Sequence, residues 1–193
     1  QAAFGRTGKM FGFEHYKKVP DIITLGKGIT SSLPLSAVVS RKEIMDVFEP
    51  GTMTSTHTGN PLCVAAAIAN IDLIQKESLP LQAEEKGEIL KDGLEEIWQK
   101  FRPYIGYIQG KGLVWAVHVV KNNTEEPNGF LAFKVVEKCV EKGLLLFAPV
   151  GKGEATIKIC PPLIITENAL QDGLSAFEEA LNEAIQDVYS GIP

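Results

Sequence analysis

The pattern of apolar and polar positions indicates two short strands near the beginning of the chain. Residues 22–25 are apolar without polar alternation, which predicts a strand buried on both faces, as in a parallel sheet. A second apolar run, 35–39, predicts another strand. Ser40, followed three residues later by Glu43, predicts a capping box at the start of a short helix. Residues 1–18 show no period, and we expect an irregular segment there.

Helical periodicity dominates the middle of the chain. Asn60-Pro61 predicts a helix start, because Asn is a favoured N-cap and Pro suits the first helical position, and this helix should run to about residue 75. A second, amphipathic helix is predicted over about 79–100 and ends at Arg102-Pro103. The segment 51–59, which precedes the first of these helices, holds five Thr or Ser residues and no charge.

Beyond Pro103 short strands alternate with helices. The expected elements are two strands within 105–120, a helix over 130–142 ended by Gly143, short strands at 144–147 and 156–160, and a helix over 167–188 capped by Thr166. The pattern therefore predicts an α/β chain in three parts. These are a buried α/β piece at 1–75, a connecting helix at 76–102, and a compact α+β domain at 103–193.

Composition narrows the class of protein without naming a function. The 193 residues are 45% hydrophobic and 22% charged, and the net charge of -5 gives no indication of nucleic acid or an anionic membrane as a partner. No apolar run reaches the roughly 18 residues that a membrane-spanning helix needs. The chain has no signal-peptide layout and no initiator Met, and we expect it to begin inside a longer protein.

Three cysteines, Cys63, Cys139 and Cys160, stand far apart. They form no CxxC pair and no Cys/His spacing typical of zinc, so no metal site is predicted. We expect each of them to be a small core residue in a reduced, cytoplasmic protein.

The triplet Gly-Lys-Gly occurs three times, around Lys27, Lys111 and Lys152. Turn chemistry accounts for Lys152, and a bend between strands accounts for Lys111, whose side chain should point to water. Lys27 differs because it follows the strand predicted to be buried, and ligands of open α/β sheets bind beyond the carboxyl ends of strands. A partly desolvated amine at that place is a candidate nucleophile for Schiff-base chemistry.

Five segments, in order and at matching spacing, resemble the class III (omega) aminotransferases. They are residues 1–11, 20–29, 55–62, 110–113 and 161–165. These aminotransferases are pyridoxal-phosphate enzymes of fold type I. The resemblance implies part of the large cofactor-binding domain, with a mainly parallel sheet, over 1–75. It also implies a small C-terminal α+β domain over 103–193.

The resemblance also implies roles for single residues. Lys27 falls on the lysine that forms the Schiff base with pyridoxal phosphate and carries the proton between the substrate α-carbon and the cofactor C4′. Gln1 falls on the glutamine near the pyridoxal O3′. Thr56 falls on the threonine that contacts the cofactor phosphate of the neighbouring subunit, with a backbone N–H from Ser55, so a homodimer is implied. A hydroxyl-rich loop before a helix N-terminus also suits anion binding on physical grounds.

Two departures from the family pattern bear on the site. The aspartate that keeps the pyridinium nitrogen protonated lies two residues before Gln1, outside this chain, as does the earlier half of the large domain. We therefore expect a fragment that does not form a complete site alone. Where the family often has a carboxylate-binding arginine, this chain has Lys158. Lysine provides a point charge in place of a planar fork, so Lys158 is a candidate for binding a substrate carboxylate or a strand lysine that faces water.

The activity implied is transfer of an amino group from an amino acid or amine to a keto acid such as pyruvate or 2-oxoglutarate. The resemblance indicates an ω-amino acid such as 4-aminobutyrate as the amino donor. Two alternatives stay open. The same scaffold also carries decarboxylases, epimerases and phospho-lyases that use the same cofactor. The fragment alone could instead be an inactive interaction domain.

Overall fold

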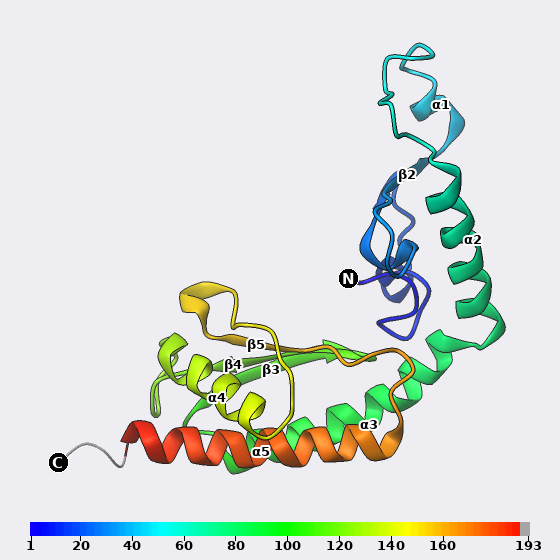
Figure 1. Cartoon of the computed structure of the whole chain (residues 1–193). Helices are drawn as coiled ribbons and strands as arrows, with labels where there is room; N and C mark the ends of the chain where they lie inside the picture. The colour runs from blue at the N-terminus through cyan, green and yellow to red at the C-terminus, as the bar shows by residue number, and fades with distance from the viewer. Residues whose placement is uncertain (190–193) are drawn as a thin grey trace. The chain divides into compact units, whose positions relative to one another are not determined.

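The computed structural model describes residues 1–189 and divides into two compact units (Figure 1). The first comprises Gln1–Gln82, and the second begins at Ala83, inside a long helix. No helix in the described part of the chain combines the length and the apolar character needed to cross a membrane. The predicted division into 1–75, 76–102 and 103–193 stays a prediction about the domains of the whole protein.

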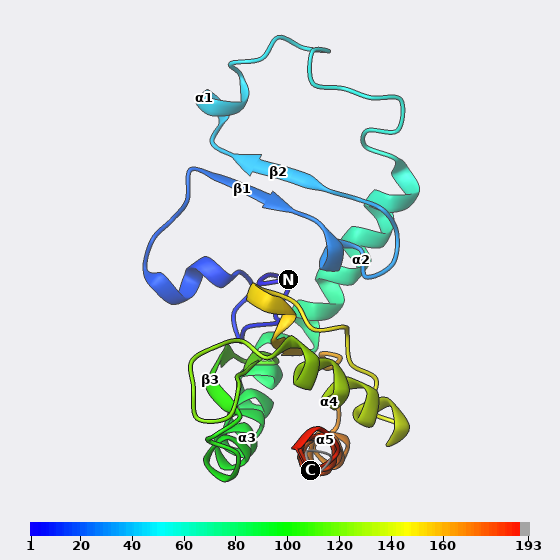
Figure 2. The same ribbon diagram turned by 90° about the vertical axis from the view of Figure 1, so that its left-hand side faces the viewer.

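The first unit contains a two-stranded antiparallel sheet and one long helix (Figure 2). Its elements are η1 (Gly12–Tyr16), β1 (Ile22–Leu25), η2 (Lys27–Ile29), β2 (Ala37–Ser40), α1 (Lys42–Met45) and α2 (Pro61–Lys76). Both predicted strands are therefore present, and their register pairs Ile22 with Ser40 and Leu25 with Ala37.

The prediction that β1 is buried on both faces, as in a parallel sheet, is wrong for the described residues. Among the described residues β1 and β2 pair only with each other, and they run antiparallel. Ile22 is 52% exposed and Val38 on β2 is 55% exposed. Burial on both faces requires a covering layer on each side, and residues 1–82 do not supply two such layers.

The predicted capping box at Ser40 and Glu43 is also absent. Ser40 Oγ donates instead to the backbone oxygen of Asp21, at 2.5 Å, and Arg41 pairs with the Asp21 carboxylate at 2.8 Å. The N-cap of the short α1 is Arg41, which makes no side-chain capping bond. Ser40 thus ties the end of β2 to the residue before β1, and its hydroxyl is not used for the helix.

The start of α2 agrees with the prediction. The Asn60 side chain accepts hydrogen bonds from the backbone N–H groups of Leu62, at 3.0 Å, and Cys63, at 3.4 Å. Pro61 is the first helical residue, where its missing N–H costs no hydrogen bond. The residues of α2 that are buried are Cys63, Ala67 and Ile74, so one narrow stripe of the helix faces the rest of the first unit.

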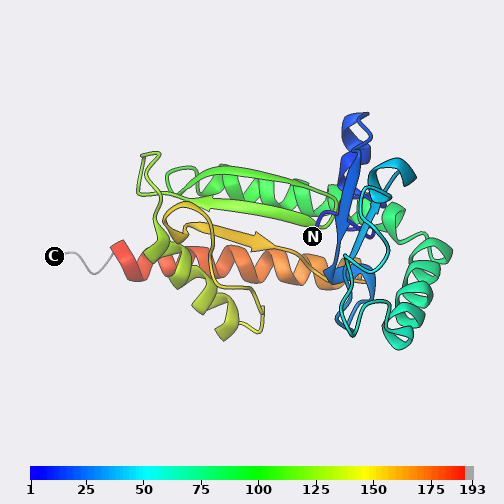
Figure 3. The ribbon, with the colours of Figure 1, turned by 90° about the horizontal axis from the view of Figure 1, so that it is seen from above.

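The second unit is a three-stranded antiparallel sheet packed with three helices (Figure 3). Its elements are α3 (Leu79–Lys100), β3 (Ile105–Lys111), β4 (Val114–Val119), α4 (Gly129–Glu141), η3 (Lys152–Glu154), β5 (Thr156–Ile159) and α5 (Glu167–Tyr189). The strand order is β3-β4-β5. Trp115, Val117 and Val119 alternate along β4 into the core, whereas the residues between them are partly exposed. This is the period-2 pattern of a sheet covered on one face.

The predicted ends of the helices in this unit are confirmed. Thr166 Oγ1 accepts the backbone N–H of Ala169 at 3.2 Å, as an N-cap does. At the end of α4, Gly143 has φ +81°, its N–H donates to Val140 O, and the next N–H, of Leu144, donates to Cys139 O. This pair of bonds is the Schellman motif.

Residues 144–147 were expected to form a strand and do not. They lie outside every ladder of the described chain. One reason is local, because the N–H of Leu144 is already used to close α4. Leu145 and Phe147 are 81% and 63% exposed, whereas Leu144 and Leu146 pack against the core. The segment is therefore an unpaired connection whose side chains alternate between packed and exposed.

Candidate functional site

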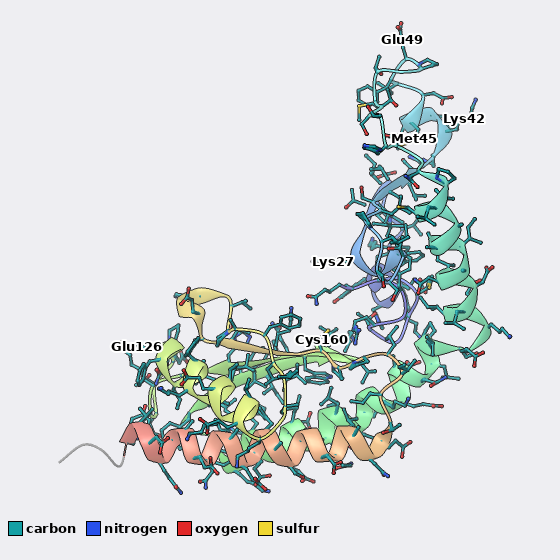
Figure 4. The ribbon with its side chains drawn as sticks, in the orientation of Figure 1. Lys27, Lys42, Met45, Glu49, Glu126 and Cys160 are labelled. Atoms are coloured by element: carbon teal, nitrogen blue, oxygen red, sulfur yellow. The ribbon has the colours of Figure 1, made fainter. Side chains whose placement is uncertain are left out.

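Lys27 begins the short turn η2, directly after β1 and Gly26 (Figure 4). Its backbone has φ +48°, the left-handed region that side chains with a Cβ rarely adopt. Its side chain is exposed. The expected desolvation of this amine is therefore not provided by the residues that the structure describes. What the chain itself provides is an unusual backbone conformation at an accessible lysine.

The turn that follows Lys27 is held firmly by its neighbours. Its last residue, Ile29, is 6% exposed, and its N–H donates to Gly26 O at 3.2 Å. From α2, Asn70 Nδ2 donates to Gly28 O at 2.8 Å and to Ile29 O at 3.2 Å. On another side, a Cβ added to Gly28 would lie 3.4 Å from the ring of Phe4. The turn is thus fixed both by hydrogen bonds and by packing.

Gln1 belongs to the segment that contacts this turn. Gln1 itself is exposed. The residues after it fold back on themselves, since Gly12 N–H donates to Ala2 O at 2.6 Å, and Phe4, which is 4% exposed, lies against Gly28. The structure therefore brings the segment that carries Gln1 and the turn that carries Lys27 together.

Ser55 and Thr56 lie in an exposed loop before α2. Ser55 Oγ and Thr58 Oγ1 are 2.9 Å apart, and Thr58 N–H donates to Ser55 O at 3.1 Å. The backbone N–H of Ser55, which the family resemblance assigned to a phosphate, donates here to Thr58 Oγ1 at 3.0 Å. The loop thus presents several hydroxyl groups in a closed local turn.

The turn that carries Lys27 (the lysine turn) and the loop that carries Ser55 and Thr56 (the hydroxyl loop) contact α2 at different points. The loop joins the helix at its N-cap, Asn60, while Asn70 holds the lysine turn. These two positions are ten residues apart in sequence, which corresponds to about 15 Å along a helix axis. The structure therefore separates Ser55 and Thr56 from Lys27 along the length of α2.

Lys158 lies on β5 in the second unit. Its neighbour Ile157 is fully buried, so the alternation of the strand places Lys158 on the opposite face, across from Ala116. Its ammonium nitrogen sits 4.5 Å from the ring centroid of Phe147, a cation–π contact. Both residues border a cavity of about 200 Å³, and its other lining side chains are mostly apolar, among them Leu146, Pro161 and Leu170.

The other two Gly-Lys-Gly triplets have the structural roles predicted for them. Lys111 ends β3 and is exposed beside the tight connection to β4. Lys152 is exposed in η3, between Gly151 and Gly153. Lys111 is thus the last residue of a strand at a bend, and Lys152 belongs to a turn.

Sequence reasoning missed Asn70 and Phe147. Asn70 carries a readable signal, because it falls on the stripe of α2 formed by Cys63, Ala67 and Ile74, where an apolar residue is expected. Phe147 lies in the segment that was interpreted as a strand, and nothing in its local pattern indicates a contact with Lys158.

Comparison with known proteins gives a consistent result. The family described as "Aminotransferase class-III" matches residues 1–181. The "Probable 4-aminobutyrate aminotransferase" of Bacillus subtilis is 38% identical over 182 residues, which cover 94% of this chain and 41% of that protein. The "Alanine/serine racemase" of Pyrococcus horikoshii is 37% identical over 185 residues, 96% of this chain and 38% of that protein. An S-selective transaminase from Arthrobacter sp., solved with alanine bound, has a TM-score of 0.85 at 34% identity, covering 94% of this chain and 42% of that one.

The chain thus spans about two fifths of the length of these curated relatives. The predicted fold class is confirmed by the solved transaminases: a partial large domain of the pyridoxal-phosphate fold type I, followed by a small α+β domain. The family match extends from Gln1 through most of the second unit, so it is not confined to one motif. The chain belongs to the class III aminotransferase family.

Proposed function

We propose that the protein containing this chain is a pyridoxal-phosphate-dependent aminotransferase and that Lys27 binds the cofactor covalently. The observation that carries this proposal is the setting of Lys27. An accessible primary amine follows β1 and Gly26 in a left-handed conformation, within a turn fixed by Asn70 and Phe4. A strained backbone that the surrounding structure holds in place is typical of functional sites. The membership of the chain in an aminotransferase family supports the same assignment.

The residues around Lys27 suit this cofactor. Its amine is the nucleophile that a carbonyl-bearing cofactor needs, and the flanking glycines leave room for a planar ring. When bound, pyridoxal phosphate supplies an electron sink for the charge left on the substrate α-carbon. Once the amino donor has displaced it from the cofactor, the free amine of Lys27 would take the proton from that carbon and return it at the C4′ position. Gln1, in the segment beside the turn, is placed near the pyridoxal O3′ in this proposal.

The hydroxyl loop suits a phosphate for reasons visible in the structure. The N–H groups of Leu62 and Cys63 are already used by Asn60, and the N–H of Ser55 is used by Thr58 Oγ1, so the donors proposed for an anion near the N-terminus of α2 are the side-chain hydroxyls of the loop. Ser55 and Thr56 carry two of these hydroxyls and add no negative charge. Hydroxyl and backbone N–H groups near a helix N-terminus favour a phosphate.

The separation along α2 supports a homodimer. Thr56 lies near the N-terminus of the helix, and the turn of Lys27 is held at Asn70, about 15 Å further along the axis. A single cofactor held by Lys27 is therefore poorly placed for the same chain's Thr56. In this proposal Thr56 contacts the phosphate of the cofactor bound to the neighbouring subunit.

Lys158 is proposed to bind a substrate carboxylate. It offers a positive charge at the edge of a mainly apolar cavity, and Phe147 restrains its ammonium from one side. A lysine supplies a single charged donor, so its carboxylate selectivity depends on how well it is held in place. Phe147 provides that restraint in this chain.

The proposed reaction moves an amino group from an amino acid or amine to a keto acid. An ω-amino acid such as 4-aminobutyrate is the proposed donor, and the 38% identity to a protein named probable 4-aminobutyrate aminotransferase supports it. The proposed compartment is the cytoplasm, where the three free cysteines of the chain would stay reduced.

A second candidate function is racemisation of an amino acid. It is favoured by one observation, the 37% identity to a protein named alanine/serine racemase. The two reactions differ in their need for a partner substrate, since a racemase returns the proton to the same carbon and requires no keto acid.

A turnover assay on the intact protein with added pyridoxal phosphate separates these functions. Amino donors are incubated with and without pyruvate or 2-oxoglutarate, and the amino acid products are resolved by chirality. Amination of the keto acid, lost in Lys27→Ala and kept in Lys152→Ala, supports the aminotransferase. Inversion of the donor without any keto acid would establish the racemase. Full turnover in Lys27→Ala would refute both.

A further inference from the structure

Asn70 is a polar residue on the buried side of α2. The buried residues Cys63, Ala67 and Ile74 recur at helical spacing, and position 70 falls on the same stripe. The Asn70 side chain is partly buried there. A buried amide is retained without cost only when its hydrogen bonds are made, so its partners indicate what it does.

The partners of Asn70 are both in the turn of Lys27. Its Nδ2 group donates to Gly28 O at 2.8 Å and to Ile29 O at 3.2 Å. An asparagine amide has two N–H donors on one nitrogen, and here that nitrogen lies within hydrogen-bond distance of two consecutive carbonyls. The tie joins residues 42 and 41 positions apart in sequence, so it is tertiary and not a local cap.

The conformation of this turn needs support. Lys27 has φ +48° although it carries a Cβ, while Gly26 beside it has an extended φ of -169°. Non-glycine residues keep such a conformation only where their surroundings fix it. The amide of Asn70 fixes the two carbonyls directly after Lys27, and Phe4 closes the space beside Gly28.

We propose that Asn70 is a positioning residue for Lys27. By holding the carbonyls of Gly28 and Ile29 it keeps Lys27 in the left-handed conformation, and this conformation sets the direction in which the amine leaves the backbone. Asn70 does not contact the amine, so it acts only through the turn. The inference rests on the proposed role of Lys27 as the cofactor-binding lysine.

The test compares three variants of the intact protein. Asn70→Leu keeps the size of the side chain and completes the apolar stripe, and Asn70→Asp keeps the shape and removes both donors. The control, Gln75→Leu, makes the same polar-to-apolar change at an exposed position of α2. The first measurement is amide hydrogen exchange at Ile29 in the cofactor-free protein. Loss of the tie should accelerate this exchange by about five- to tenfold in both Asn70 variants and leave it unchanged in Gln75→Leu.

The second measurement separates positioning from stability. In the holoenzyme, Asn70→Leu should lower kcat by about tenfold or more, with KM within about twofold and the melting temperature unchanged or raised. A purely structural role predicts a lowered melting temperature and an unchanged kcat. Unchanged exchange at Ile29 together with unchanged kcat in both Asn70 variants would overturn the inference.

The two proposals fail in different ways. If borohydride does not fix pyridoxal phosphate on Lys27 in the wild-type protein, the proposed function fails, and the positioning role of Asn70 falls with it. If the cofactor is fixed on Lys27 and the Asn70 variants match the wild type in exchange and kcat, only the role of Asn70 is wrong.

Discussion

Backbone conformation separates Lys27 from the two other lysines that have the same neighbours. Within the triplets of Lys111 and Lys152 the positive φ values fall on glycines, namely Gly112, Gly151 and Gly153, where they carry little strain, and Glu154, which follows the second triplet, has φ +51°. Around Lys27 the positive φ falls on the lysine itself. Sequence pattern identified Lys27 through its place after a strand and through a family resemblance. It could not reveal the conformation, because that depends on a tie to Asn70 from a distant part of the chain.

A substitution at Lys158 tests the proposed carboxylate site. Lys158→Ala in the holoenzyme should raise the KM for a carboxylate substrate by about tenfold or more, because a charge-assisted hydrogen bond is lost. Phe147→Leu, which removes the ring beside the ammonium, should shift the KM in the same direction by a smaller factor. Steady-state kinetics gives both values, with Lys152→Ala as control. An unchanged KM in Lys158→Ala would remove Lys158 from the substrate site.

The pH dependence of stability should carry the signature of Cys139. Its side chain is fully buried, and burial raises the pKa of the thiol to about 12. A free cysteine thiol has a pKa of about 8.5, so the unfolded chain loses this proton first as the pH rises. The contribution is therefore complete below about pH 8.5 and is lost progressively as the pH rises towards 12.

Urea unfolding of Cys139→Ala and wild type between pH 9 and 10 checks this expectation. The decline of the unfolding free energy with pH should be shallower in the variant by up to about 1.4 kcal/mol per pH unit. Hydrogen bonds to acidic side chains of α4 and α5 raise the pKa values of Lys138 and Lys142 above the usual 10.5. Both lysines are present in wild type and variant, so their own contribution to the pH dependence is common to the two slopes and cancels in the difference. Equal slopes would show that the thiol is not protected by burial.

At the scale of elements, local signals were reliable where a cap or a periodic stripe dictates the structure. The N-cap Asn60, the cap Thr166 and the end of α4 at Gly143 all lie where the sequence indicated. The errors arose where a residue had two possible uses. The Ser40 hydroxyl binds the backbone of Asp21 and does not cap a helix. The N–H of Leu144 closes the end of α4 and does not join a strand ladder. Such competition is decided by tertiary contacts that local pattern does not contain.

The contact of α3 with the connection between β3 and β4 predicts an unusual response to alanine. A Cβ on Gly87 would lie 2.5 Å from the Cα of Gly112, and backbone cannot give way as a side chain can. Gly87→Ala should therefore destabilise the second unit by about 1–3 kcal/mol.

Gly173 in α5 is the matched control. A Cβ there would meet only Leu144 Cδ1, at an ordinary 3.7 Å, so Gly173→Ala should be neutral or stabilise by up to about 1 kcal/mol. Urea unfolding of the two variants gives the difference. Equal stabilities would contradict the close backbone packing of α3.

At the scale of the whole molecule, the family and the fold class could be predicted from the order and spacing of the motifs. The exposure of β1 could not, because burial on both faces depends on layers that residues 1–82 do not supply. The chain covers about two fifths of the length of its curated relatives. The proposed homodimer also belongs to this scale. It assigns Lys27 and Thr56 of one chain to two different cofactor molecules, one in each subunit.

Complementation between two inactive variants tests the shared site. Lys27→Ala lacks the attachment point, and Thr56→Asp repels the phosphate. If Thr56 serves the neighbour's cofactor, a mixed dimer contains one intact site. Random re-pairing of equal amounts should then restore about a quarter of the wild-type activity, because half of the dimers are mixed and half of their sites are intact. No recovery, with mixed dimers confirmed by mass spectrometry, would place Thr56 and Lys27 at the same cofactor.

The most direct measurement for the central claim is the location of the covalent cofactor. The intact protein is loaded with pyridoxal phosphate, reduced with borohydride, digested and mapped by mass spectrometry. The reduced cofactor should be found on the peptide that contains Lys27, and Lys27→Ala should carry none, while Lys111→Ala and Lys152→Ala are labelled like the wild type. A label on another lysine, or an equal label in Lys27→Ala, would contradict the assignment of Lys27.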